Sequence, residues 1–140
     1  MKKKNILMLL LILVAVLHSG SRAYAQWEPT NGLYSGDVHS ILYSNGEIIA
    51  GTHYIYKSAD NGKTWFMSNN GISVNVSAIR GLVKISTTLV AATDAGVFYS
   101  NDNGDNWSQS AGTSGINIWN IIVKGTNVFI STNENGIMKS

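Results

Sequence analysis

The chain has 140 residues and no cysteine, which allows one ordinary domain and excludes a disulfide framework, a thiolate metal site and a cysteine nucleophile. The formal charge of +2 is misleading, because four of the ten basic residues lie within the first 22 positions. From Gln26 onward six basic residues stand against eight acidic ones, so this segment offers no basic patch for a nucleic acid. Frequent glycine, asparagine, β-branched and aromatic residues, with a single proline, favour an all-β chain with many turns.

The N-terminal segment 1–25 has the organisation of a signal peptide. Three lysines at 2–4 precede an unbroken apolar run at 6–17, and Ala-Tyr-Ala at 23–25 is a small-x-small cleavage site. The run spans about 18 Å as a helix, too short for a hydrocarbon core of about 30 Å. We therefore expect a signal helix, cleavage before Gln26, no stable membrane span afterwards, and a secreted, periplasmic or cell-surface location. An uncleaved anchor or a buried helix is the alternative, and the lack of cysteine in an exported chain favours a bacterial origin.

The rest of the chain repeats with an offset of 42 residues. Segment 58–65 reads S-A-D-N-G-K-T-W, and segment 100–107 reads S-N-D-N-G-D-N-W. The flanking sequences also repeat, and a third copy of them ends at Ser140, where a third S-x-D-N-G-x-x-W would begin. A period of about 40–45 residues is typical of proteins built from successive small sheets.

Runs of apolar residues separated by turn residues predict four short strands in each of the first two units and three in the last. The expected strands are 38–43, 47–52, 55–58 and 65–67, then 77–84, 88–93, 97–100 and 107–109, and finally 118–124, 127–132 and 137–140. Four strands per unit predict propeller blades at about 31–69, 70–111 and 112–140 within the mature segment 26–140. We therefore expect an all-β partial β-propeller of about 2.7 four-stranded blades after the signal helix.

Every fixed position of the motif has an expected structural role. The aspartate is expected to accept a backbone N–H bond from two residues on, as in an Asx turn, while the glycine takes positive φ. The serine should bond to the turn backbone, and the tryptophan should fold over the hairpin and bury about 150–250 Å². The alternative, in which the aspartates act in catalysis or bind calcium, lacks the remaining ligands of a calcium loop. The motif residues are Ser58, Asp60, Gly62, Trp65, Ser100, Asp102, Gly104 and Trp107.

The S-x-D-x-G-x-x-W motif resembles the Asp box, or BNR repeat, of sialidases, xyloglucanase-like glycoside hydrolases, sortilin-type receptors and photosystem-assembly propellers. The resemblance covers about residues 31–140 and implies a β-propeller fold. It implies no single function, because the motif marks a hairpin of the blade in enzymes and binding proteins alike.

We expect no catalytic residue in this chain. A sialidase-like site, as the resemblance implies it, needs three arginines, whereas Arg80 is the one arginine after the signal peptide. Segment 93–96 is similar to the T-D-x-G-G stretch of xyloglucanase-like enzymes, but the sequence places no partner acid about 5–9.5 Å from Asp94, which we interpret as a turn residue. Phosphate loops, dinucleotide fingerprints and zinc patterns are absent from the sequence, so we expect no cofactor and no metal.

Three aromatic residues are candidates for stacking against a ligand such as a sugar at the rim of a blade: Tyr54, Tyr56 and Trp119. The alternative is that these rings pack between blades, because burial of a ring is strongly favourable. The expected partners are therefore a carbohydrate or a protein.

The number of repeats leaves the ring open, because propellers close with about four to eight blades. The chain is then a fragment of a longer secreted protein, one part of a homo-oligomeric ring, or a capped open stack, and we favour the first explanation. We expect an exported structural or binding module. The alternative is the N-terminal fragment of a xyloglucanase-like or sialidase-like glycoside hydrolase whose catalytic acids lie largely beyond residue 140.

Overall fold

The computed structural model describes residues 27–30, 32–33, 36–72 and 75–140, so the expected signal helix lies outside the described residues. In the described part of the chain, all regular secondary structure is β-strand, and the strands form three antiparallel sheets. Within the same residues, no helix has the length and apolar character needed to cross a membrane.

Within each sheet, strands that follow one another in the chain pair with each other. The first sheet contains β1 (Ser40–Ser44), β2 (Glu47–Gly51), β3 (Ile55–Ser58) and β4 (Phe66–Met67). The second contains β5 (Ile79–Ile85), β6 (Thr88–Thr93), β7 (Gly96–Ser100) and β8 (Ser108–Gln109), and the third contains β9 (Ile118–Lys124), β10 (Asn127–Thr132) and β11 (Ile137–Lys139). The predicted strands are confirmed to within two residues at each end. We call the three sheets blades 1, 2 and 3.

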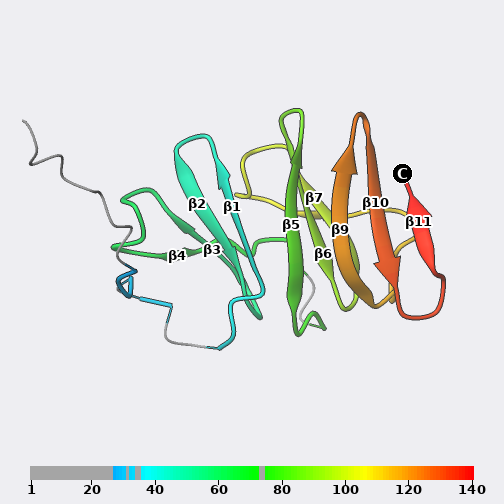
Figure 1. Cartoon of the computed structure of the whole chain (residues 1–140), viewed down its shortest axis with the longest axis horizontal. Helices are drawn as coiled ribbons and strands as arrows, with labels where there is room; N and C mark the ends of the chain where they lie inside the picture. Colours follow the sequence, from blue (N-terminus) through cyan, green and yellow to red (C-terminus); the bar gives the residue numbers. More distant parts are fainter. Residues whose placement is uncertain (1–26, 31, 34–35, 73–74) are drawn as a thin grey trace, which may run out of the picture.

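The blades lie side by side in sequence order along the long axis of the molecule (Figure 1). Neighbouring blades approach each other most extensively through their first strands, β1, β5 and β9. Two apolar cores separate the blades, one around Ile49, Ile79 and Phe98 between blades 1 and 2, and one around Val90 and Ile118 between blades 2 and 3. The fold is therefore held together by packing between successive sheets.

A threonine lies at the end of the second strand in every blade: Thr52 directly follows β2, and Thr93 and Thr132 are the last residues of β6 and β10. In blade 2 its Oγ1 donates to the carbonyl of Gly96 at 2.7 Å and accepts from the amide of Ala95 at 3.0 Å. Each threonine thus closes the turn that leads into the third strand. The three threonines belong to the repeating sequences that flank the motif, but the sequence alone did not predict their hydrogen bonds.

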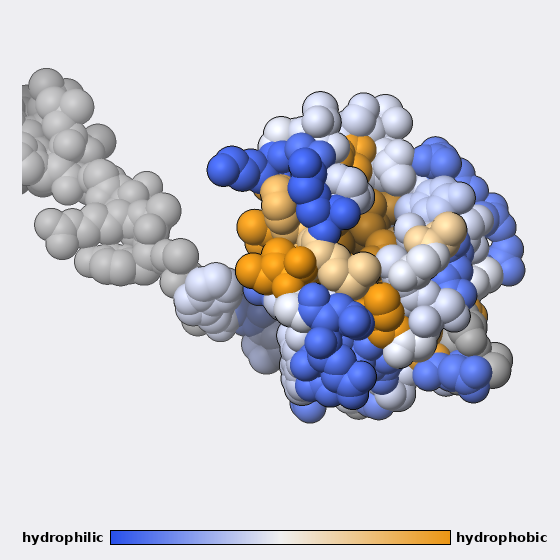
Figure 2. Space-filling model, turned by 90° about the vertical axis from the view of Figure 1, so that its right-hand side faces the viewer, coloured by the Kyte–Doolittle hydropathy of each residue, from blue (hydrophilic) through white to orange (hydrophobic). Residues whose placement is uncertain are grey.

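The two ends of the stack expose surfaces that are buried at the junctions between blades. Leu82 and Ile121 face the preceding blade and are 7% and 5% exposed, whereas Ile41 at the same repeat position in blade 1 is 68% exposed. At the other end Ile122 and Ile137 are 57% and 78% exposed. Figure 2, which looks toward the end of the molecule that carries blade 3, shows an apolar patch with a hydrophilic surround. We call these surfaces the open faces of blades 1 and 3.

Candidate functional site

The two S-x-D-N-G-x-x-W turns have the same hydrogen-bond pattern. In the second turn, Ser100 Oγ accepts from the amide of Gly104 at 2.8 Å and donates to Asp102 at 2.7 Å. The Asp102 carboxylate accepts from the amide of Asn106 at 2.9 Å and from its side chain at 2.7 Å. The first turn repeats these contacts, with Asp60 accepting from the amide and hydroxyl of Thr64 at 2.8 and 2.6 Å.

The sequence predicted an Asx turn, in which the aspartate accepts a hydrogen bond from the amide two residues later. In the structure, the amide that donates to each aspartate lies four residues later instead. The reason is that Asn61 and Gly62 both have positive φ, at 60° and 83°, and this left-handed pair turns the chain back toward the carboxylate. Hydrogen bonds from Asn106 hold the pKa of Asp102 down at about 2, and bonds from Thr64 do the same for Asp60. Both carboxylates are therefore ionised, and each accepts hydrogen bonds within its own turn.

The tryptophans of the two turns differ in burial. Trp107 is 4% exposed, and its ring N–H donates to the carbonyl of Ser68 in blade 1 at 3.0 Å. Trp65 is half-buried, and its ring N–H donates at 3.1 Å to the carbonyl of Gly62 within its own turn. The second turn therefore sits against the preceding blade, whereas Trp65 lies against the short N-terminal segment near Gly32.

A polar network joins the second turn to blade 1. Lys57 lies between Glu47 and Asp105, with Nζ at 3.2 and 2.7 Å from their carboxylate oxygens. Desolvation lowers the pKa of Lys57, but the two carboxylates outweigh it and the net shift is upward, so the lysine stays charged. Asn103 donates to Glu47 at 2.5 Å and accepts from Ser44 at 2.8 Å. These contacts join the second turn to blade 1.

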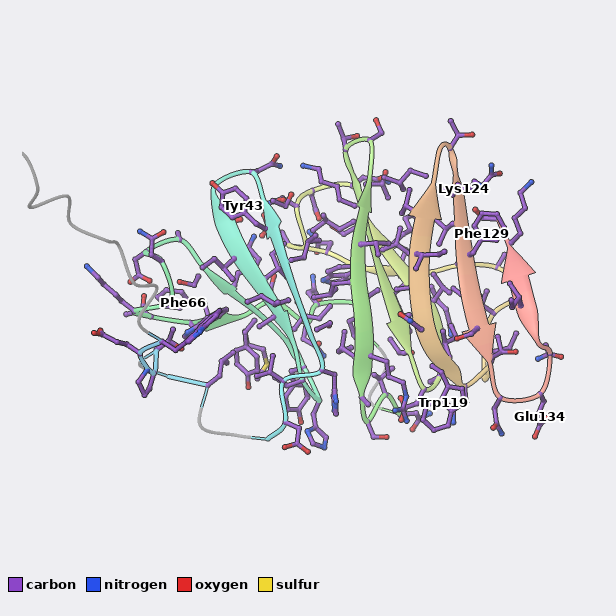
Figure 3. All side chains as sticks on the ribbon, viewed as in Figure 1. Tyr43, Phe66, Trp119, Lys124, Phe129 and Glu134 are labelled. Atoms are coloured by element: carbon purple, nitrogen blue, oxygen red, sulfur yellow. The ribbon has the colours of Figure 1, made fainter. Side chains whose placement is uncertain are left out.

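The three candidate stacking residues lie in different environments. Tyr54 is on the turn after β2 and is 45% exposed. Tyr56 is on β3 at the repeat position of Phe98, which is 1% exposed in the core, so Tyr56 belongs to the open face of blade 1. Trp119 is 53% exposed at the start of β9 and lies on the lower edge of the molecule in Figure 3.

A contact with Arg80 sets Trp119 apart. The guanidinium carbon of Arg80 lies 4.4 Å from the centroid of the Trp119 ring, a cation–π distance. Both residues occupy bulges, because the strand pairing passes from Ile79 to Gly81 in β5 and from Ile118 to Asn120 in β9. A bulge turns the extra side chain away from the regular alternation of the strand. Sequence reasoning named Trp119 but missed Arg80 as its neighbour.

Asp94 is part of the turn between β6 and β7. Its carboxylate accepts from the amides of Ser77 and Ala78 at 3.0 and 3.3 Å and from the Ser77 hydroxyl. Desolvation raises the pKa of Asp94, but these hydrogen bonds outweigh it and the net shift is downward. The carboxylate therefore holds the segment that enters β5, and it is ionised rather than poised as a general acid.

Comparison with known proteins gives a fold but no family. No family model matches the chain, and no curated protein matches it. Among solved structures, YCF48 from Cyanidioschyzon merolae is similar with a TM-score of 0.63 and 14% identity, over 83% of this chain and 37% of that chain. An ancestral GH74 enzyme has a TM-score of 0.60 and 16% identity, over 79% of this chain and 15% of that chain.

A third similar structure is the extracellular domain of a hybrid two-component system from B. thetaiotaomicron, with a TM-score of 0.59 and 20% identity, over 80% of this chain and 17% of that one. These neighbours are propeller proteins, and the three sheets have the fold of propeller blades. The chain spans less than two fifths of the length of each of these neighbours.

Proposed function

We propose that the chain is an exported Asp-box β-propeller segment with a structural and binding role, and that it forms part of a larger propeller. The open face of blade 3 carries this proposal. Ile122 and Ile137 occupy the repeat positions of Val83 and Val97, which are packed into the core between blades 2 and 3. Apolar side chains at positions built for burial indicate that a further blade covers this face.

The charges at the joint favour a particular kind of blade. Between blades 1 and 2, Lys57 pairs with Asp105 of the following turn. Lys139 stands at the repeat position of Lys57, and Lys63 stands at the repeat position of Asp105. A second copy placed head to tail on blade 3 would therefore set Lys63 against Lys139. The proposed partner is accordingly an Asp-box blade with an acidic residue where blade 1 has Lys63, supplied by the remainder of a longer chain.

Sedimentation equilibrium of the purified chain and its charge variants tests this proposal. The wild-type chain should self-associate weakly, because its two open faces meet with like charges. Lys63→Asp and Lys139→Asp should each restore an opposite pair and lower the self-dissociation constant about tenfold. The double variant, which again has like charges, serves as the matched control and should return to the wild-type constant.

Two outcomes contradict the proposal. A wild-type chain that forms a stable ring whose mass and affinity do not respond to the charge variants would show that copies of the same chain cover the open faces. Absence of association in every variant, including the two with an opposite charge pair, would show that an acidic residue at this turn position does not direct a blade onto the open face of blade 3.

We propose no catalytic step for this chain. The support is that Asp60, Asp94 and Asp102 each accept bonds from the backbone of their own blade, as expected for structural residues. Release of reducing sugar from xyloglucan, or of sialic acid from sialyllactose, by the purified chain would contradict this part of the proposal.

A further inference from the structure

Two buried polar atoms without a hydrogen-bond partner occur in the described part of the chain, and they belong to Arg80 and Asn117. Arg80 is the residue that contacts the Trp119 ring, and Asn117 precedes Trp119 by two positions. Native proteins leave few buried polar groups unpaired, so two such groups, one on the residue that contacts Trp119 and one two positions before Trp119 in the sequence, distinguish this part of the chain. The remainder of the described chain shows no comparable cluster.

The charge of Arg80 has no counterpart among the described residues. Both ion pairs found there involve Lys57, and the carboxylate of Asp94 on the neighbouring loop is bonded to Ser77 and Ala78. Arg80 is half-buried, and its Nε is buried without a hydrogen-bond partner, while its guanidinium carbon lies over the Trp119 ring. A guanidinium that forms no ion pair among the described residues can pair with a planar anion such as a carboxylate, which matches its fork of N–H donors.

The ring of Trp119 provides the second contact. The guanidinium lies over the ring, which fixes the orientation of both groups, and 53% of Trp119 remains exposed. The exposed indole surface suits the C–H face of a saccharide ring, since the aromatic face is electron-rich.

A shallow polar hollow provides the third contact. It has a volume of about 170 Å³ and is lined in part by Asn117, Asn133, Glu134 and Asn135. The amide side chains can donate to and accept from hydroxyl groups, and the Glu134 carboxylate can accept from them, so the hollow suits the hydroxyl groups of a ligand and not its carboxylate. Glu134 lies on the lower edge of the molecule in Figure 3, as Trp119 does, so the hollow and the ring share one edge.

We propose that this edge of blades 2 and 3 binds a carboxylated saccharide. The carboxylate pairs with the terminal nitrogens of Arg80, a sugar ring stacks on Trp119, and hydroxyl groups bond to the amide-lined hollow near Asn117. The bulges in β5 and β9 bring Arg80 and Trp119 together from neighbouring blades. The absence of an acidic partner for Arg80 within the described chain favours an acidic over a neutral sugar.

The test is a titration of the full chain with trigalacturonic acid, its methyl ester, sialyllactose, lactose and an acidic glutamate-rich peptide, read by calorimetry. An acidic saccharide should bind more tightly than its neutral counterpart. Arg80→Met should weaken that binding at least tenfold while Arg80→Lys weakens it less, and Trp119→Ala should weaken it at least tenfold. Tyr43→Ser is the matched control, because Tyr43 is 71% exposed on the opposite edge in Figure 3 and its loss should leave binding unchanged.

Circular dichroism of each variant confirms that the sheets are retained. Equal binding of acidic and neutral saccharides, no saccharide binding at all, binding of the peptide alone, or unchanged binding by Arg80→Met would each overturn the proposal. These results do not depend on the sedimentation of the charge variants. The proposal of a ligand site and the proposal of a larger propeller can therefore be refuted independently.

Discussion

Replacing Trp107 by alanine tests whether the second turn stabilises the fold through its contact with the preceding blade. The side chain is 4% exposed, and its ring N–H bonds to the carbonyl of Ser68. A tryptophan buries about 150–250 Å², worth about 4–6 kcal/mol at about 25 cal/mol per Å². Large-to-small changes of buried aromatic residues cost about 3–5 kcal/mol, so we expect the free energy of unfolding to fall by about 4 kcal/mol. Urea denaturation followed by circular dichroism measures this change.

Two variants keep the test informative if Trp107→Ala does not fold. Trp107→Phe retains most of the ring and removes the hydrogen bond, so it should cost about 1 kcal/mol. Trp65→Ala is the matched control, because Trp65 has the same motif position but is half-buried and bonds within its own turn, and it should cost about 1–2 kcal/mol. A cost below about 1 kcal/mol for Trp107→Ala, or an equal cost at both positions, would refute the reasoning.

Further predictions concern the carboxylates, the ion pair and the glycines. Because the pKa of Asp102 in the fold is about 2 and lies below its unfolded value, its stabilisation is complete above about pH 4 and is lost as the pH falls toward about 2. Asp102→Asn should flatten this part of a plot of unfolding free energy against pH. A double-mutant cycle with Lys57→Met and Asp105→Asn should give a coupling of about 0.5–1 kcal/mol that shrinks in about 1 M salt. Gly71→Ala should destabilise the fold far more than Gly112→Ala in thermal melts. Both residues have positive φ, but an added Cβ at Gly71 would lie 2.0 Å from a backbone oxygen, whereas the space around Gly112 is open.

The strands were predictable because each is bounded by strong local turn signals. Asn45 and Gly46, for example, adopt φ values of 50° and 86°, the left-handed pair that a tight hairpin between β1 and β2 requires. The repeat then predicted that successive sheets would follow one another, and the similarity to propeller structures supports this arrangement. Such signals depend on a few neighbouring residues, so they can be recognised without knowledge of how the sheets pack.

The contacts between blades were less accessible to sequence reasoning. Arg80 and Trp119 are far apart in the sequence, and they meet because a bulge at the same place in each strand redirects both side chains. A bulge changes the alternation by one residue, which a pattern of apolar positions does not reveal. Tyr56 illustrates the same limit, because its role as part of an open face is visible only through its counterpart Phe98.

The contact of the second turn with the preceding blade has a consequence for how such genes change in length. Asn103 and Asp105 lie in the turn, while their partners Glu47 and Lys57 lie in the preceding blade, 56 and 48 residues earlier in the chain. Blade 1 thus carries one half of this joint, and the turn of blade 2 carries the other. Duplication or loss of a whole unit would recreate a compatible joint wherever the charges agree, whereas a shift by part of a unit would not. Ancestral tandem duplication in whole periods is the evolutionary route that this chemistry permits.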